Sequence, residues 1–131
     1  MHLFENMNLT DGERILKSYP FELSGGMNQR VGIMMAMVLK PDLLFADEPT
    51  SALDVTVQAQ VVKEMMKMRE MYGTGIAIVT HNIGVVEYMA DQVAVMHQGH
   101  LVEYGKKEDV IRRPRAEYTK KLLGAVLRLK R

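Results

Sequence analysis

The sequence predicts an α/β fold in which parallel strands are flanked by helices. Two short apolar runs, Leu43–Ala46 and Ile76–Val79, are bounded by turn-forming residues, which is typical of buried parallel strands. Segments with the apolar spacing of helices precede and follow each run, and such alternation favours a parallel sheet. Ligands of these sheets bind at the carboxyl ends of the strands, so the residues that follow the two runs are the first candidates for a functional site.

Length and composition are those of a packed globular chain. The 131 residues suggest one domain by length, and 47% of them are hydrophobic. A net charge of +1 predicts no strong attraction to nucleic acid or to a membrane surface. The chain has no cysteine, which excludes disulfides and thiolate metal sites. Its longest apolar run is far shorter than the roughly 20 residues that cross a bilayer. The first residues lack the pattern of a signal peptide, so we expect any work at a membrane to be peripheral.

The N-terminal part is predicted to contain two helices. Residues 1–18 have the apolar spacing of a helix and its exit, and Tyr19-Pro20 breaks that helix. Ser24 is a suitable N-cap for a second helix over about residues 26–39. The expected apolar face of this second helix consists of Val31, Met34, Met35, Val38 and Leu39.

A third helix is expected between the two strands. Asp54 or Thr56 caps it, and Gly73-Thr74-Gly75 ends it. We expect one face of this helix to pack against the rest of the domain. The apolar residues of that face recur at helical spacing and are Val57, Val61, Met65, Met68 and Tyr72.

The C-terminal part is predicted to hold a β-hairpin among short helices. His97 and His100 fall in this hairpin, and we interpret them as surface residues because no carboxylate or cysteine accompanies them as a metal ligand. The expected elements are a helix over about residues 83–89, strands Gln92–His97 and Leu101–Tyr104 joined by residues 98–100, and helices Lys106–Arg112 and Ala116–Leu129.

Ser24-Gly25-Gly26 stands at the start of the second predicted helix. The first N–H groups of a helix have no partner inside it, and the helix dipole places partial positive charge there. Glycines let a phosphate approach the backbone closely, so the three residues can form an anion site. A serine cap with a flexible entry explains the tripeptide equally well by itself. The octet Leu23–Arg30 that contains it is much more specific.

Asp47-Glu48 directly follows the first predicted strand. A carboxylate at this place can hold Mg²⁺, directly or through water. A second carboxylate beside it can polarise the water that attacks a phosphate. Pro49 is expected to force Glu48 into an extended backbone and so to fix its direction. The ordinary alternative is a surface pair of acidic residues at the end of a strand, and the sequence that flanks the pair argues against it.

In this order and spacing, the motifs resemble those of ABC-type ATPases. Leu23–Arg30 is similar to the signature motif, Leu43–Glu48 to the Walker B motif and Ser51–Asp54 to the D-loop. Three further segments resemble the oligopeptide, dipeptide and nickel branch of the ABC importers. These segments are Tyr19–Glu22, Leu53–Gln60 and Tyr118–Leu123, the last of which follows Ala116-Glu117 where the branch usually has His-Pro.

The resemblance implies which residues bind nucleotide. Ser24, Gly25 and Gly26 would contact the γ-phosphate of ATP held by a partner subunit. Gln29 of the signature motif and Asp54 of the D-loop would also contribute to nucleotide binding, with the D-loop crossing the interface between subunits.

The resemblance also implies the residues of the reaction. Asp47 would be the Walker B aspartate that holds Mg²⁺, and Glu48 would be the catalytic glutamate. His81, just after the second strand, matches the switch histidine, which hydrogen-bonds the γ-phosphate and senses its loss. Alone, a histidine at that place would more often be a helix cap or a structural residue. Asn82 stands where this family often has aspartate.

The fold implied by the resemblance is a partial P-loop NTPase core. Residues 1–105 would be the C-terminal part of an ABC nucleotide-binding domain, and residues 106–131 a helical extension. Within the former, residues 1–40 would belong to the helical subdomain and residues 41–105 would run from the Walker B motif through the switch histidine. The 131 residues contain no GxxxxGK[ST] phosphate loop. We therefore expect a C-terminal portion that lacks the Walker A loop and the Q-loop.

The function implied is that of the ATP-binding and ATP-hydrolysing subunit of an ABC importer for peptides or nickel. Its cofactors would be ATP and Mg²⁺. Its partners would be a second ATPase subunit, membrane permease subunits and, indirectly, an extracytoplasmic substrate-binding protein, with no nucleic acid. Its location would be cytoplasmic and peripheral, on the inner face of the cell membrane. We expect the chain alone to be inactive and to self-associate, because its strands and helices would lack their N-terminal neighbours.

Two alternatives fit parts of the sequence. A truncated ABC fragment that acts as a non-catalytic interaction module, paired with a full-length subunit or with itself, agrees with the missing phosphate loop. A lobe of a DNA-repair ABC ATPase would share the signature and Walker B motifs. Such a lobe would carry long heptad segments or basic stretches before the signature, and the sequence has neither.

Overall fold

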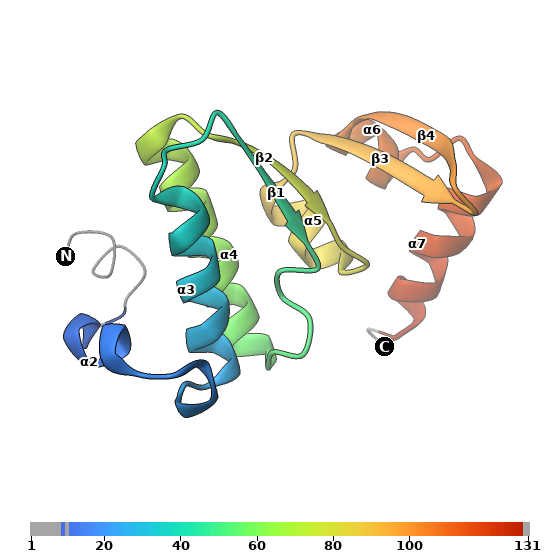
Figure 1. Cartoon of the computed structure of the whole chain (residues 1–131). Helices are drawn as coiled ribbons and strands as arrows, with labels where there is room; N and C mark the ends of the chain where they lie inside the picture. Colours follow the sequence, from blue (N-terminus) through green and yellow to red (C-terminus); the bar gives the residue numbers. More distant parts are fainter. Residues whose placement is uncertain (1–8, 10, 130–131) are drawn as a thin grey trace. The chain divides into compact units, whose positions relative to one another are not determined.

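The computed structural model describes residue 9 and residues 11–129 (Figure 1). The chain divides into two compact units, Met1–Val79 and Thr80–Arg131. Unit 1 contains α2 (Gly12–Lys17), the 3₁₀ helix η1 (Pro20–Glu22), α3 (Gly25–Met37), β1 (Leu43–Asp47), α4 (Val55–Tyr72) and β2 (Gly75–Val79). Unit 2 contains α5 (Ile83–Met89), β3 (Gln92–His97), β4 (His100–Lys106), α6 (Lys107–Arg112) and α7 (Glu117–Leu129). The α/β class is as the sequence predicts, while the predicted functional division after residue 105 stays a prediction.

The predicted break at Tyr19-Pro20 is confirmed, and a short 3₁₀ turn follows it. The helix before it is described as α2 alone, because residues 1–8 and 10 of the predicted helix lie outside the described residues. The backbone N–H of Tyr19 donates to the Glu22 carboxylate at 2.7 Å, which closes the 3₁₀ turn. The side-chain amide of Asn28 donates to the Pro20 carbonyl at 2.7 Å and so ties this turn to α3.

Ser24 caps α3 as predicted, since its Oγ accepts a hydrogen bond from the N–H of Met27 at 3.3 Å. The predicted apolar face of this helix is wrong in part. Met35 is 66% exposed and Leu39 is 87% exposed, and Val38 is exposed as well. The buried residues are Ile33, Met34 and Met37. The sequence left the face ambiguous because apolar residues surround the helix, so the position of α4 decides which of them are covered.

The prediction for α4 is confirmed at both ends. Asp54, not Thr56, is the N-cap, and its carboxylate accepts from the N–H of Val57 at 2.9 Å. Gly73 ends the helix with a φ of 67°, the left-handed conformation that glycine adopts without a steric cost. The buried face consists of Val61, Val62, Glu64, Met65 and Met68. It includes one acidic residue that the apolar pattern did not indicate.

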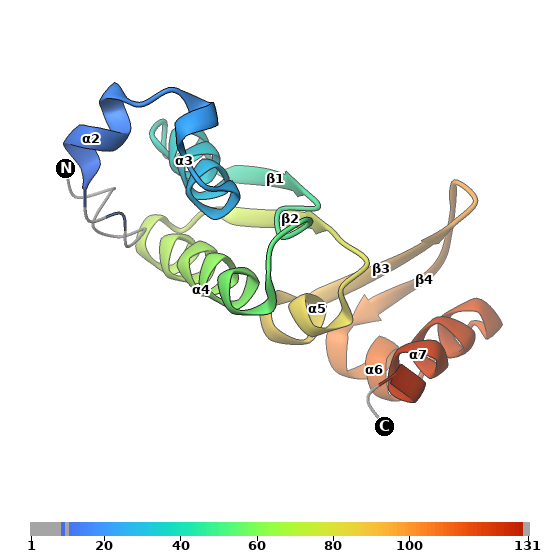
Figure 2. The ribbon, with the colours of Figure 1, turned by 90° about the horizontal axis from the view of Figure 1, so that it is seen from below.

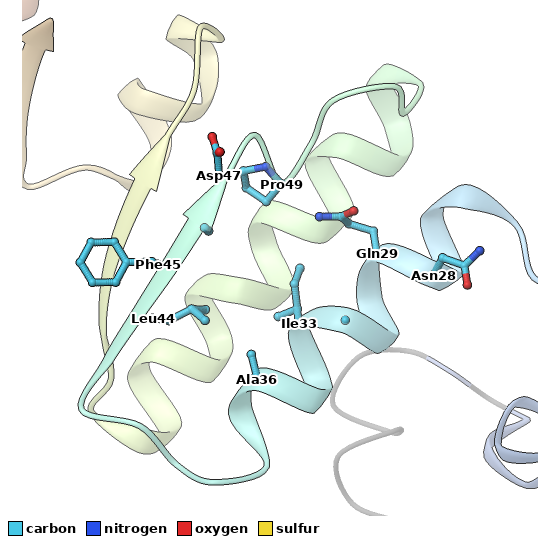
Figure 3. Close-up of a pocket in the computed structure, with 10 residues that line it drawn as sticks. Asn28, Gln29, Ile33, Ala36, Leu44, Phe45, Asp47 and Pro49 are labelled. Carbon is cyan, nitrogen blue, oxygen red and sulfur yellow. The ribbon is translucent and has the colours of Figure 1, made fainter. Parts of the chain in front are cut away.

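Strands β1 and β2 pair in parallel, with Leu43 opposite Gly75 and Asp47 opposite Val79. Thr74, which is buried, donates its hydroxyl to the Pro41 carbonyl at 2.8 Å and so holds the two strand entries together. The pairing is as predicted, but the expectation that β1 is a buried strand is wrong in part. Leu43 and Phe45 lie on an exposed face, because within unit 1 helices α3 and α4 cover only the other one (Figures 1 and 3).

Unit 2 is an antiparallel hairpin with helices packed on it (Figure 2). Its turn is made by Gln98 and Gly99, both with positive φ, which is the turn type that suits two-residue hairpins. Apolar side chains of three elements, Val95, Val110 and Leu123, are buried. The predicted strands and helices are confirmed to within two residues at their ends, and the largest difference is at β4, which extends two residues beyond the predicted end, to Lys106.

The start of α7 is fixed by the side chain of Glu103 in β4. Its two carboxylate oxygens accept hydrogen bonds from the N–H groups of Arg115 at 2.8 Å and Ala116 at 3.1 Å. His97 stacks on Tyr118 with ring centroids 3.8 Å apart, so it is half-buried, whereas His100 is exposed as expected. The loop before α7 is therefore held by side chains of the hairpin.

Candidate functional site

Most of the predicted site residues lie at one end of unit 1. Helices α3 and α4 run in the direction opposite to β1, so their N-terminal ends and the carboxyl end of β1 lie at the same end of the unit (Figure 1). The two helix N-caps there are Ser24 and Asp54, and the strand ends in Asp47. Two positive helix ends beside the end of a strand form a polar region that favours an anionic ligand.

The Ser24-Gly25-Gly26 turn faces α4 as well as solvent. A Cβ added at Gly26 would lie only 2.7 Å from Cγ1 of Val57, and one at Gly25 would lie 3.8 Å from Cδ2 of Leu53. The missing side chain of Gly26 is thus explained by the close approach of two helices. Sequence reasoning missed this contact, because nothing in the motif indicates which side of the turn α4 occupies.

The backbone of Glu48 is not extended, contrary to the prediction. Its φ is 45°, in the left-handed region that non-glycine residues rarely adopt. Pro49 disfavours the right-handed helical conformation for the residue before it, as argued from the sequence. The left-handed alternative is selected by two hydrogen bonds. The Glu48 N–H donates to the Val79 carbonyl at 2.8 Å, and the Glu48 carbonyl accepts from the N–H of Ser51 at 3.0 Å.

The segment that resembles a D-loop forms a tight turn into α4. Ala52 also has a positive φ, of 59°, and the side-chain amide of Gln58 donates to the Leu53 carbonyl at 2.9 Å. The carboxylate of Asp54 is already engaged as the helix cap. The turn is thus held by its own contacts in this structure, and the nucleotide-binding role of Asp54 stays a prediction.

A cavity of about 220 Å³ lies between α3 and β1 (Figure 3). Gln29 extends from α3 toward Pro49 across one end of it, and the carboxylate of Asp47 stands at the end of the strand. Asp47 is exposed and Gln29 is half-buried. The floor is apolar, with Ile33, Leu44 and Ala46 among its lining residues. The structure thereby brings two predicted site residues, Gln29 and Asp47, to one hollow.

His81 belongs to unit 2, where it is exposed in the turn before α5. The next residue, Asn82, is the N-cap of that helix, and its side-chain oxygen accepts from the N–H of Gly84 at 2.9 Å. The Asn82 N–H in turn donates to the hydroxyl of Thr80 at 3.1 Å. An aspartate at this place would cap the helix in the same way, so the departure from the usual family residue preserves the local structure.

A buried ion pair joins α3 to α4 and was not predicted. Nε of Arg30 lies 3.2 Å from Oε2 of Glu64, with side chains that are 11% and 3% exposed. A signal was present in the sequence, because Glu64 falls among apolar residues on one face of its helix. Identifying its partner requires knowing which face of α3 is turned toward it.

Within the described residues, no three His, Asp or Glu side chains gather closely enough to hold a metal ion by themselves. No helix of that same part combines the length and the apolar character needed to cross a membrane.

Comparison with known proteins places these motifs in a family. Residues 1–51 match the ABC transporter family. The chain is 47% identical over 129 residues to a peptide import ATP-binding protein of Brucella ovis, covering 98% of this chain and 38% of that protein. It is 48% identical over 118 residues to the dipeptide transport ATP-binding protein DppD of Bacillus subtilis, covering 90% of this chain and 35% of that one. It is 44% identical over 129 residues to the oligopeptide transport ATP-binding protein OppD of Salmonella typhimurium, covering 98% of this chain and 38% of that one.

A solved structure agrees with the sequence relatives. The chain is similar to the dimeric post-hydrolysis state of the ATP-binding cassette MJ0796 bound to ADP and Pi, with a TM-score of 0.69 and 29% identity. The likeness covers 81% of this chain and 44% of that one. The chain spans between a third and two fifths of the length of the curated relatives it matches. From its motifs, its fold and these relatives, the chain belongs to the ABC transporter family.

Proposed function

We propose that the complete protein is the ATP-hydrolysing subunit of an ABC importer for peptides or nickel. The observation that carries the proposal is the gathering of the Ser24–Gly26 turn, Asp47-Glu48 and the Leu53-Asp54 turn at one end of unit 1. The names of the relatives, which are peptide, dipeptide and oligopeptide transport proteins, support the class of cargo. Nickel comes from the resemblance of the sequence alone.

The residues of the reaction divide between the two units. Glu48 orients and polarises the attacking water, and its unusual backbone conformation aims the carboxylate differently from an extended residue. His81, exposed before α5, hydrogen-bonds the γ-phosphate and senses its loss. Neither role needs a change in the local fold, because the backbone around each residue is held by hydrogen bonds of its own.

The nucleotide-binding residues act on ATP held by a partner subunit. The amide groups of Ser24–Gly26, at the start of a 13-residue helix, face the γ-phosphate, where the helix dipole stabilises negative charge. Gln29 and Asp54 complete the contact. This arrangement makes two subunits pair head to tail, each completing the site of the other, as homodimer or heterodimer.

Asp47 fits the Mg²⁺ that this chemistry implies. Its carboxylate is exposed at the end of β1, and a single protein carboxylate that leaves room for water and phosphate oxygens is the kind of ligand that Mg²⁺ takes. The ion, when bound, neutralises charge on the transferred phosphate. The chain itself contributes one oxygen ligand, the carboxylate of Asp47 at the end of β1.

The further partners are membrane permease subunits and, indirectly, an extracytoplasmic substrate-binding protein, with no nucleic acid. The protein is then cytoplasmic and peripheral on the inner face of the membrane. In this arrangement residues 1–40 belong to the helical subdomain, residues 41–105 to the catalytic core and residues 106–131 to an extension. The 131 residues taken alone bind MgATP weakly or not at all, because they hold no phosphate loop.

The test is Glu48→Gln in the complete protein. Turnover falls by about 10²–10⁴-fold while MgATP binding is preserved, because the amide keeps the size of the side chain but cannot act as a base. The matched control is Glu70→Gln, which changes an exposed carboxylate on α4 and leaves turnover unaltered. Near-normal hydrolysis in Glu48→Gln would move the catalytic role to another residue.

A non-catalytic module that pairs with a full-length subunit is the second candidate, favoured by the missing phosphate loop. Calorimetric titration of the 131-residue chain with MgATP tests the premise that both candidate functions share, which is that this chain alone does not bind nucleotide tightly. Micromolar affinity would show that the chain grips nucleotide without the loop, and would contradict both the trans arrangement and the non-catalytic module.

A further inference from the structure

At Gly26 the backbone of α3 comes close to the Val57 side chain of α4. A Cβ there would lie 2.7 Å from Cγ1 of Val57, a separation that Cβ atoms essentially never show, so any other residue would require the Val57 side chain or one of the two helices to shift. Gly25 has ordinary clearance, with 3.8 Å to Leu53. Gly32, further along the same helix, meets nothing within 4 Å. Only one of the three glycines of α3 is therefore required by packing.

The rest of the interface leaves α3 little freedom to shift. Arg30 and Glu64 form the buried ion pair one turn beyond Gly26. Met34 and Met37 of α3 are buried, as are Val61 and Met65 of α4. Because interiors are close-packed, a displacement at the first turn of α3 cannot be absorbed by sliding along this interface.

We propose that Val57 is a positioning residue for the Ser24–Gly26 turn. By contacting Gly26 it sets the distance between the amide groups at the start of α3 and the Leu53-Asp54 turn at the start of α4. In this view position 26 must be glycine because the side chain of Val57 in α4 occupies the place of a Cβ. Access of phosphate to the backbone of residue 26 does not by itself require glycine. This inference rests on the proposed function, in which both turns face the same nucleotide.

The test is a cycle of substitutions in the 131-residue chain: Gly26→Ala, Val57→Ala, the double variant, and Gly32→Ala as the control. The first readout is the set of ¹H–¹⁵N amide resonances of residues 24–27 and 53–57. Gly26→Ala shifts both sets, and the double variant restores them because the new methyl fills the space left by the valine. Gly32→Ala moves neither set, since its methyl meets open space.

The second readout is pairing with an intact subunit, for which the probe is MgATP-loaded DppD of Bacillus subtilis. Gly26→Ala weakens pairing by at least about tenfold, as expected when contact groups are misplaced by a fraction of an ångström or more. The double variant recovers wild-type pairing, although it carries no glycine at position 26. A merely structural role for Gly26 would leave pairing of the folded chain unchanged.

Two outcomes overturn the inference. If Val57→Ala fails to restore the amide resonances of Gly26→Ala, the contact does not set the position of the turn. If the resonances return but pairing stays lost, the phosphate needs the glycine itself. If the wild-type chain does not pair with MgATP-loaded DppD at all, the proposed trans contact fails, and the amide resonances alone decide whether Val57 positions the turn.

Discussion

The two units of the chain satisfy their backbone and apolar groups in different ways. Unit 1 is built on a two-stranded parallel sheet, whereas parallel sheets are normally wider and covered on both faces. Phe45 is 75% exposed and Val79 is 61% exposed on its uncovered face. Unit 2 is built on an antiparallel hairpin with a two-residue turn, and its last helix is tied down by Glu103. The unit that holds most of the candidate site residues is thus the one whose fold depends more on neighbours outside it.

The hairpin of unit 2 also exposes apolar side chains. Met96, Leu101 and Tyr104 are more than half exposed. The difference lies in how each unit is specified. For β1 to pair with β2, the chain must close a connection that contains the whole of α4. For β3 to pair with β4, it closes a connection of only two residues. Substitutions that act on one unit alone show whether the two are independently stable.

The largest effect is expected for Arg30→Met in unit 1. Removal of the guanidinium leaves Glu64 buried without this ionic partner, which costs about 3 kcal/mol of unfolding free energy. Urea unfolding followed by amide exchange in α3 and α4 measures the loss. The double variant Arg30→Met/Glu64→Leu recovers most of the lost unfolding free energy. The control Lys63→Met, at an exposed position of α4, has little effect on it. An equal loss in unit 2 would show that the units unfold together.

The next effect concerns self-association of the isolated chain. Phe45→Lys places a charge on the uncovered face of β1 and weakens association by about tenfold, since burial of one aromatic side chain contributes about 1.5–3 kcal/mol. Light scattering over a concentration series measures the change. Tyr104→Lys, on the exposed face of the hairpin, is the matched control. A wild-type chain that stays a well-folded monomer at every concentration would contradict the expectation that it self-associates.

A smaller effect is expected from removing one helix cap in each unit. Asp54→Ala lowers the stability of α4 by about 1 kcal/mol, and Asn82→Ala lowers that of α5 by a similar amount. Hydrogen exchange resolves the two units separately. If the units are independent, each variant accelerates exchange in its own unit. If either variant accelerates hydrogen exchange in both units, the two units are not independently stable.

The smallest effect is a pH dependence confined to unit 2. The Thr119 hydroxyl and the N–H groups of Arg115 and Ala116 hold the pKa of Glu103 below its ordinary value. A carboxyl whose pKa is lowered by folding stabilises the fold above its unfolded pKa, and this stabilisation is lost as the pH falls through the lowered value. Amide spectra between about pH 5 and 3 should therefore show α7 loosening from the hairpin. Glu103→Gln removes this transition, and Glu108→Gln, at an exposed position of α6, retains it.

The order of elements could be predicted because each is specified locally. Asp54 and Gly73 mark the two ends of one helix by cap chemistry, and the Gln98-Gly99 turn marks the hairpin. These signals lie within a few residues of the structure they determine. The family could be identified for a related reason, since its motifs are short and contiguous in the sequence.

What the sequence could not supply depends on contacts between distant residues. The buried face of α3 is chosen by α4, which is why Met35 was wrongly placed in the apolar face. The left-handed φ of Glu48 is selected by the carbonyl of Val79, 31 positions further along the chain. The residues of the candidate site therefore stay a prediction from the sequence, while the backbone conformation of Glu48 and the close approach of Gly26 to Val57 required the fold.

The backbone of Glu48 has a consequence for protein engineering. A non-glycine residue in the left-handed region carries a conformational cost of about 1–2 kcal/mol, which glycine would relieve. A library selected only for folding or heat resistance should therefore accumulate Gly or Asn at position 48, and lose the carboxylate that the proposed reaction needs. Thermostabilised versions of this chain are best obtained by holding that codon fixed and diversifying the exposed face of β1 instead.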